Sequence, residues 1–333
     1  MSKVAGAVFP SAAASWWKPW MGYTLAAAGF AFAALGYFNV HFSLGLPEKV
    51  FNRHSEVAVI VLYGIPTILL TRDRYQKIRL SVLITLVFTL WFLVPTLWPF
   101  NVDWFGTNRP WDATFPSWEV PGTWTNVGLF AAALLFGRRV KCGWMNTCVA
   151  FRETAAAPFR KFTPRTSLAH WLWRLRFLTS AFYVIYFALL FGPKSAFTDA
   201  YFYWFWTMVI TMYFGSLLFS PLLGNRVWCR WLCPMPFTWA NVLGFFRLRV
   251  DRSRCTECGL CEEVCDFGLP IRELSKKNPM IRTTQCMGCG RCRTVCPRGA
   301  ISFYDVRDFV REKILKKPPR NQRTPAGLPT KRR

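Results

Sequence analysis

Residues 255–265 read CTECGLCEEVC, and residues 286–297 read CMGCGRCRTVCP. Both stretches carry four cysteines with the same spacing, CxxCxxCxxxC, and a proline follows the second stretch. Zinc sites and disulfides are the alternatives to consider, but zinc motifs usually pair two CxxC units across a longer gap. The spacing therefore favours iron–sulfur clusters, with the thiolates of each run wrapped around them.

The spacing is that of bacterial two-cluster ferredoxins, in which the fourth cysteine of each run ligates the other cluster. The sequence thus predicts two 4Fe-4S clusters in a C-terminal α+β, ferredoxin-like domain over residues 251–308. The expected ligands of the first cluster are Cys255, Cys258, Cys261 and Cys296. The expected ligands of the second cluster are Cys286, Cys289, Cys292 and Cys265.

The rest of the chain is strongly apolar. Hydrophobic residues make up 53% of the sequence, and they gather in long runs before residue 225. Such runs are typical of membrane spans, so the sequence predicts an α-helical polytopic membrane domain over residues 21–224. About six transmembrane helices are expected, at about 21–40, 57–70, 80–100, 120–137, 177–193 and 201–224. The second run is short and contains Gly64 and Pro66, so a re-entrant piece is the alternative there.

Lys and Arg predict the orientation of these helices. Four basic residues lie between 72 and 79, and nine lie in the loop 138–176, which also carries a CGW cysteine motif. With six spans, these loops share a side with both termini, and basic residues collect in cytoplasmic loops. We therefore expect a multi-pass protein of the bacterial inner membrane with both termini and the cluster domain in the cytoplasm. The tryptophans of the segment 1–20 are expected to anchor it at the membrane interface.

The net charge of +25 raises the question of nucleic-acid binding. Much of the excess lies in the junction 225–250, in the next few residues and in the tail 309–333, whereas the cluster region itself is nearly balanced. Basic segments beside a membrane are attracted to anionic lipid, which is the simpler account. We expect membrane lipid as a partner and no nucleic acid, and we expect the Pro-rich tail to be disordered.

Four further cysteines follow two of the predicted spans. Cys142 and Cys148 lie in RRVKCGWMNTC, and Cys229 and Cys233 lie in NRVWCRWLC, at the start of the CxxxCP junction. Both pairs should emerge at the same depth on the cytoplasmic side. They could bind a third iron–sulfur cluster, copper or zinc, form a redox-active thiol pair, or simply pack as apolar side chains.

Together these motifs resemble the NapH and NosR group of membrane ferredoxin-type proteins over roughly residues 57–305. The matching residues are the eight ferredoxin cysteines and Cys142, Gly143, Trp144, Cys229, Trp231, Cys233 and Pro234. Two positions differ from the pattern. The first pair lacks the CxxxCP spacing, and Asp266 stands where a ferredoxin motif usually has proline. The second difference should leave the ligands unchanged, because proline is not a ligand.

The resemblance implies electron transfer between the membrane quinone pool and a partner redox protein, in respiration or metalloenzyme maturation. An electron-transfer subunit is expected more than a self-sufficient oxidoreductase. One alternative is a maturation factor that reduces or hands over copper at the four membrane-face cysteines, since soft thiolates select Cu(I). A second alternative is a structural subunit in which the clusters only stabilise the fold. Quinone chemistry would need a proton acceptor, and the candidates are His54, Glu56, Asp103, Glu153 and His170.

Overall fold

The computed structural model describes residues 19–52, 54–93, 121–189, 193 and 195–317. The predictions for the interfacial tryptophans at 16 and 17, for Asp103 and for the tail from 318 onward fall outside these residues. The same holds for the end of the third expected span, beyond Leu93.

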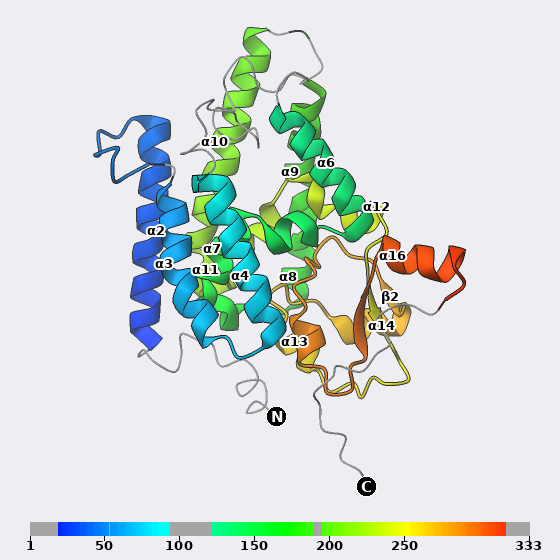
Figure 1. Cartoon of the computed structure of the whole chain (residues 1–333). Helices are drawn as coiled ribbons and strands as arrows, with labels where there is room; N and C mark the ends of the chain where they lie inside the picture. The colour runs from blue at the N-terminus through cyan, green and yellow to red at the C-terminus, as the bar shows by residue number, and fades with distance from the viewer. Residues whose placement is uncertain (1–18, 53, 94–120, 190–192, 194, 318–333) are drawn as a thin grey trace.

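Long helices make up the first two thirds of the described chain (Figure 1). Each apolar run singled out in the sequence contains one of them. They are α2 (Pro19–Phe42), α3 (Ser55–Leu70), α4 (Arg74–Phe88), α6 (Pro121–Phe136), α9 (Leu175–Leu189) and α10 (Ala196–Leu218). α4 continues into a π-helical turn, Thr89–Leu93, and α3 keeps its helical path through Pro66. α3 packs against both α2 and α4, and α9 packs against α10.

Three of the helical segments in the described residues are long and apolar enough to cross a membrane: Met21–Val40, Arg74–Leu93 and Ser167–Leu189. Ser55–Leu70 and Val127–Phe136 are apolar but shorter. α10 is 23 residues long, yet it is not among the three, and its Tyr, Trp and Thr side chains lower its mean hydropathy. The length and composition of three helices thus fit a membrane protein, and the six expected spans remain predictions.

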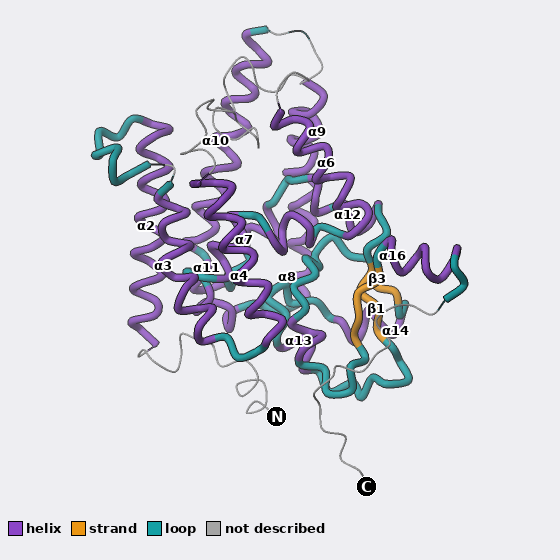
Figure 2. The backbone as a smooth tube through the Cα atoms, in the orientation of Figure 1, coloured by secondary structure: helices purple, strands orange, loops and turns teal. Residues whose placement is uncertain are grey.

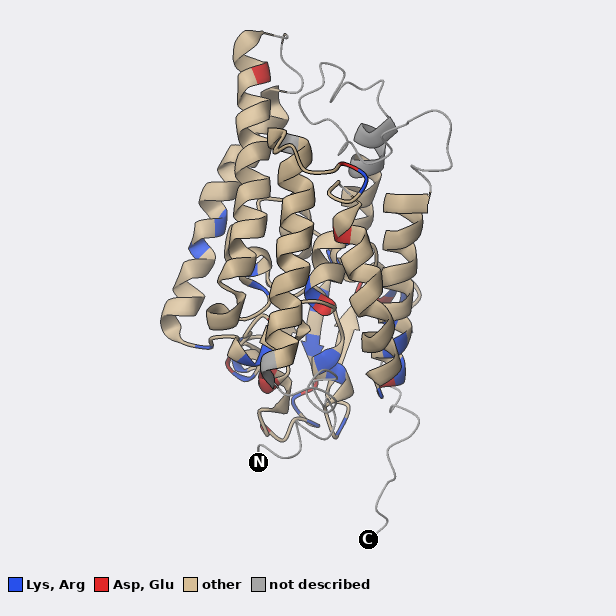
Figure 3. Ribbon diagram, turned by 90° about the vertical axis from the view of Figure 1, so that its left-hand side faces the viewer, with Lys and Arg blue, Asp and Glu red and all other residues tan. Residues whose placement is uncertain are grey.

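Apolar side chains also point outward from these helices. Leu62 and Leu69 on α3, Val184 on α9 and Leu218 at the end of α10 are each more than 60% exposed. Contiguous exposed apolar surface in a folded protein marks contact with lipid or with another protein. Lys and Arg gather mainly in the lower half of the view in Figure 3, which also contains the strands.

Short helices fill the space between the long helices and the C-terminal unit. They are the π-helical turn η2 (Arg139–Gly143), α7 (Thr147–Glu153), η3 (Ala157–Phe162), α8 (Ser167–Trp171), η4 (Leu172–Arg174), α11 (Ser220–Leu223), the π-helical turn η5 (Trp228–Leu232), η6 (Pro236–Thr238) and α12 (Ala240–Leu243). α7 packs against α3 and α4, and η5 packs against α9 and α10.

The C-terminal unit combines a small sheet with short helices (Figure 2). The strands are β1 (Arg247–Val250), β2 (Met280–Ile281) and β3 (Ile301–Tyr304), and the helices are α13 (Leu260–Glu263), α14 (Ile271–Lys277), α15 (Arg291–Thr294) and α16 (Val306–Phe309), followed by the π-helical turn η7 (Val310–Ile314). The sheet is antiparallel with β1 in the centre. Leu248 pairs with Ile281 on one side and Phe303 on the other, so apolar side chains line one face. The sheet begins at Arg247, within the predicted junction.

A buried ion network joins the C-terminal unit to the helices. Glu153, at the end of α7, is completely buried. Its carboxylate oxygens contact four guanidinium groups: those of Arg79 on α4 at 3.0 Å, Arg160 in η3 at 2.6 Å, Arg226 before η5, and Arg291 on α15. Burial alone would raise the pKa of Glu153, but these arginines lower it well below its usual value. One ionised carboxylate therefore ties four segments together.

Asp266, the residue that replaces the usual proline, extends this network. Its carboxylate lies 3.3 Å from Arg291 Nη1, 3.4 Å from Arg160 Nε and 3.6 Å from Arg226 Nη2. The departure from the ferredoxin pattern thus provides a second carboxylate where α15 meets the helices, and the expectation that the ligands are unchanged stays a prediction.

We expect Glu153→Gln to destabilise the protein by roughly 3–5 kcal/mol, because breaking a buried ion pair leaves uncompensated charge behind. Arg160, Arg226 and Arg291 would then share only Asp266, and Arg79 would lose the carboxylate that it contacts. The measurement is denaturant unfolding of the purified protein in detergent. Glu257→Gln is the matched control, since Glu257 pairs with Lys276 and Arg252 at the surface. Equal stability of the two variants would contradict a joining role for Glu153.

Candidate iron-sulfur site

The two cysteine runs fold as two similar halves. In each half a glycine with a φ of 82°, Gly259 or Gly290, turns the chain into a four-residue helix, α13 or α15. This left-handed backbone favours glycine, which explains why CGxC occurs in both runs. The two short helices pack against each other. The last cysteine of each run is thereby carried toward the other half.

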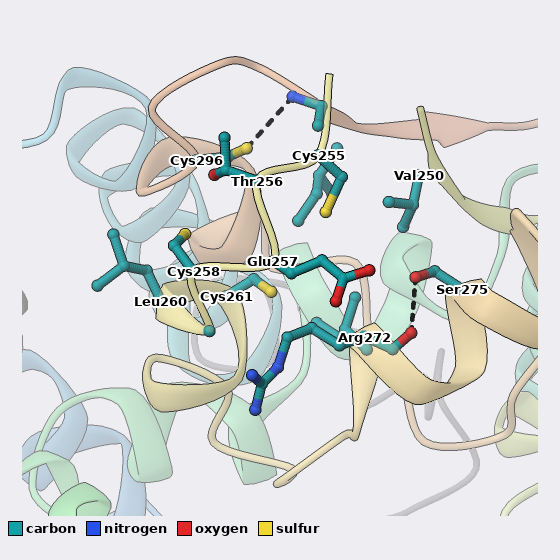
Figure 4. Close-up of a pocket in the computed structure, with 14 residues that line it drawn as sticks. Val250, Cys255, Thr256, Glu257, Cys258, Leu260, Cys261, Arg272, Ser275 and Cys296 are labelled. Carbon is teal, nitrogen blue, oxygen red and sulfur yellow. Dashed lines mark hydrogen bonds between the residues drawn. The ribbon is translucent and has the colours of Figure 1, made fainter. Parts of the chain in front are cut away.

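The first group of thiols surrounds a pocket (Figure 4). The pocket is lined by Cys255, Cys258 and Cys261 from the first run and by Cys296 from the second. Burial, together with the charges of Glu262, Cys258, Cys296 and Cys255, raises the pKa of Cys261 to about 12. The backbone N–H of Ala300 donates to Cys296 Sγ at 3.2 Å. Cys296 therefore lies with the first run.

The second group is more deeply buried. Burial raises the pKa of Cys292 well above its usual value, and the charges of Cys289, Cys286 and Cys265 act in the same direction. Burial also raises the pKa of Cys286, and the charges of Cys289 and Cys265 act in the same direction. Cys265 thus lies with the second run. The grouping is compatible with crossed ligation, and the ligand set of each cluster stays a prediction.

The four thiols that line the pocket form the donor set that a 4Fe-4S cube needs. In the part of the chain that the structure describes, no group of three or more His, Cys, Asp or Glu side chains is arranged to hold a metal ion. The comparison with family models agrees with a cube: residues 254–301 match the 4Fe-4S dicluster domain.

The chain carries a 4Fe-4S dicluster domain. Its known role as an iron–sulfur module supports electron transfer as the task of this region. The match covers the two cysteine runs and not the helices. No curated protein and no solved structure matches the chain.

The four remaining cysteines lie between the helices and the dicluster domain. Cys142 lies in the π-helical turn η2 and Cys229 in the π-helical turn η5. In the sequence, an Arg-Val pair and one further residue precede each of these two cysteines. π-Helical turns are rare and frequent at functional sites. Cys142, Cys229 and Cys233 are buried, and Cys148 is half-buried.

These four thiols share one electrostatic environment. Burial, together with the charges of Cys229 and Cys142, raises the pKa of Cys233 to about 12. Burial lowers the pKa of Lys141 to about 8, while Cys142, Cys148 and Cys233 oppose that shift. The structure therefore brings together the two pairs that lie 81 or more positions apart in the sequence.

Hydrogen bonds connect this region to the second thiol group. The Asn241 side chain donates to the Cys286 carbonyl and accepts from the Arg138 backbone N–H at 2.9 Å. On the other side, Gln76 Nε2 donates to the Cys289 carbonyl at 2.8 Å. Asn241 and Gln76 were not singled out in the sequence, because a lone amide on a helix carries no motif. Their roles depend on contacts with the distant dicluster domain.

Buried arginines surround both regions. Arg138 and Arg176 donate to the Thr284 carbonyl at 2.7 and 3.1 Å, and Arg230 donates to the Pro164 carbonyl at 3.0 Å. All three are almost completely buried. Among the described residues none of the three has a carboxylate within ion-pair distance, so backbone oxygens satisfy part of their hydrogen-bonding capacity and nearby thiolates are their natural counter-charges.

The proposed proton acceptors have other contacts here. Glu153 belongs to the ion network, which holds it ionised. His170 Nε2 lies 2.9 Å from the Gly268 carbonyl, and Glu56 accepts from the Tyr213 hydroxyl at 2.7 Å. Glu153 and His170 thus link the helices to the dicluster domain. A quinone site is not defined by these contacts.

Cys265→Ala should perturb the cluster held by Cys286, Cys289 and Cys292 and leave the other cluster nearly intact, because Cys265 lies with that second group. Electron paramagnetic resonance of the reduced protein would distinguish the two signals. Cys296→Ala is the matched variant, and it should affect the cluster of Cys255, Cys258 and Cys261 instead. Loss of the opposite signal in each variant would show that every run binds its own cube.

Proposed function

We propose that this chain is a membrane-bound electron-transfer protein that passes single electrons between the quinone pool and a redox protein partner. The supporting observation is the tight attachment of the dicluster domain to the ends of apolar helices through Glu153, Asp266 and four arginines. Such an attachment would hold clusters at a constant distance from the membrane. The clusters supply one-electron chemistry, while the chain holds them and shields the second group from water.

A membrane location is supported by the three helices long enough to span and by the outward-facing apolar side chains. The full proposal is a six-helix protein of the bacterial inner membrane, with the dicluster domain in the cytoplasm. The basic loops 72–79 and 138–176 support this orientation, because Lys and Arg collect on the cytoplasmic side. A soluble partner in the cytoplasm could then reach the clusters directly.

Reporter fusions test this orientation. A reporter that is active only outside the cytoplasm should give signal when it is fused after Ser195, between α9 and α10. Fusions after Arg160 and after Arg311 should be silent, since both positions lie on the basic side. Signal at Arg160 and Arg311 with none at Ser195 would place the dicluster domain outside the cytoplasm and exclude a cytoplasmic partner.

The proposal includes a third metal–sulfur site at Cys142, Cys148, Cys229 and Cys233. Their burial, their shared electrostatic environment and their connection to the Cys286 loop through Asn241 support a carrier at this place. Arg138 and Arg176 lie close enough to these thiols to stabilise an anionic centre. Such a centre would relay electrons between the bilayer and the second ferredoxin cluster.

The test is Cys233→Ser, because hard oxygen replaces soft sulfur poorly as a ligand. Anaerobically purified wild type should contain about twelve irons per chain, and the variant about eight, if the site holds a cube in addition to two others. In membranes, the variant should exchange electrons with a quinol analogue more slowly, by about tenfold or more if the relay is the main path. Absorbance of the clusters follows this exchange.

Met235→Leu is the control, because it preserves side-chain volume two positions away and removes no thiol. Equal iron content and equal kinetics in Cys233→Ser and wild type would exclude the thiols from the electron path. Copper in the wild type that is lost from the variant would favour the alternative of copper reduction or maturation. A wild-type protein without electron exchange with quinol would contradict the proposed function itself.

A further inference from the structure

The two thiol groups of the dicluster domain lie in opposite electrostatic surroundings. Four arginines act on the second group: Arg138 on Cys286, Arg226 and Arg291 on Cys289, and Arg230 on Cys265. All four are at least nine-tenths buried. Their positions are fixed by contacts with the Thr284 carbonyl, Glu153, Asp266 and the Pro164 carbonyl, respectively. Positive charge is therefore held permanently around this group.

The carboxylates beside the second group compensate only part of this charge. In the ion network, Glu153 also pairs with Arg79 and Arg160, and Asp266 also pairs with Arg160. Arg138 and Arg230 have no carboxylate at ion-pair distance among the described residues. Nε and Nη1 of Arg230 also lack a hydrogen-bond partner there. The surplus of positive charge thus faces the cysteines.

The first group lies nearer the surface, and the charged side chains beside it pair with one another. Cys258 is exposed. Arg272, which acts on Cys261, is itself paired with Glu262 at 2.8 Å. Glu257 pairs with Lys276 at 3.1 Å and with Arg252 at 3.2 Å. Solvent screens all of these charges.

Charge of this kind shifts the reduction potential of a cluster. A cube with four thiolate ligands is anionic, and reduction adds one more negative charge. Buried guanidinium groups stabilise the added charge without the screening that acts at the surface. Water stabilises a reduced first cluster too, so the difference between the two potentials depends on the guanidinium charges of Arg138 and Arg230, which no carboxylate at ion-pair distance compensates among the described residues and which lie in a medium of low dielectric constant.

We infer that the cluster of Cys286, Cys289, Cys292 and Cys265 has the higher reduction potential, so electrons flow from the exposed first cluster inward to the membrane. The inference rests on the proposed function and gives it a direction. The donor would be a soluble one-electron reductant that docks at the exposed Cys258 face. Each transfer oxidises the donor and reduces the first cluster, which then reduces the second. Two electrons and two protons finally convert a quinone to a quinol.

The experiment is a potentiometric titration of the purified full-length protein, followed by electron paramagnetic resonance. The signal assigned to the second cluster through the Cys265→Ala variant should appear at the higher potential. Arg230→Gln should move that signal to lower potential, because it removes a charge beside Cys265. Arg230→Lys keeps the charge and should restore most of the wild-type value.

Two further variants keep the test decisive. Arg272→Gln removes an exposed, paired charge near Cys261 and should leave the potential of the second cluster unchanged. Arg138→Gln removes another buried charge and replaces Arg230→Gln if that variant fails to assemble its clusters. A first cluster with the higher potential, or no shift in either buried variant, would overturn the inference. These equilibrium measurements need neither quinone nor partner, so they fail independently of the proposed function.

Discussion

The arrangement of this molecule depends on one buried carboxylate. Glu153 receives guanidinium groups from α4, from η3, from the segment before η5 and from α15 of the dicluster domain. The contacts with Arg79, Arg226 and Arg291 join parts of the chain that are far apart in sequence, and Arg160 adds a local contact. Without Glu153 the same arginines would repel one another in a space from which water is excluded. The ion network therefore fixes the position of the clusters relative to the apolar helices.

The local features of the protein could be predicted from its sequence, because they follow from spacing and composition. The CxxCxxCxxxC runs predicted the dicluster domain, and a family match to residues 254–301 confirms that part. Apolar runs predicted helices, and a helix occupies each run. Three helices are long and apolar enough to cross a membrane, and the six spans and their topology stay predictions. The short second run of the sequence became a regular helix through Pro66.

The contacts between the domains could not be predicted in the same way. From the sequence, Glu153 is a candidate proton acceptor. A single acidic residue in a basic loop does not show which arginines it will pair with. In the sequence Asp266 was visible only as a missing proline, and its contact with Arg291 depends on where the fold places α15. Asn241 and Gln76 bond to carbonyl groups of the cysteine loops, which leave no pattern of residue types. Long-range polar pairing is set by the fold and not by local periodicity.

The surplus of buried arginine also bears on assembly. Arg138, Arg176 and Arg230 lie in the contact region without a carboxylate at ion-pair distance among the described residues, and burying an uncompensated charge is costly. Anionic metal–sulfur centres at the neighbouring cysteines would supply the missing negative charge. Arg138 and Arg230, which we infer to favour reduction of the second cluster, would therefore also favour attachment of a loaded domain over an empty one. Electrostatics would thus couple the loading of the clusters to the docking of the domain on the helices.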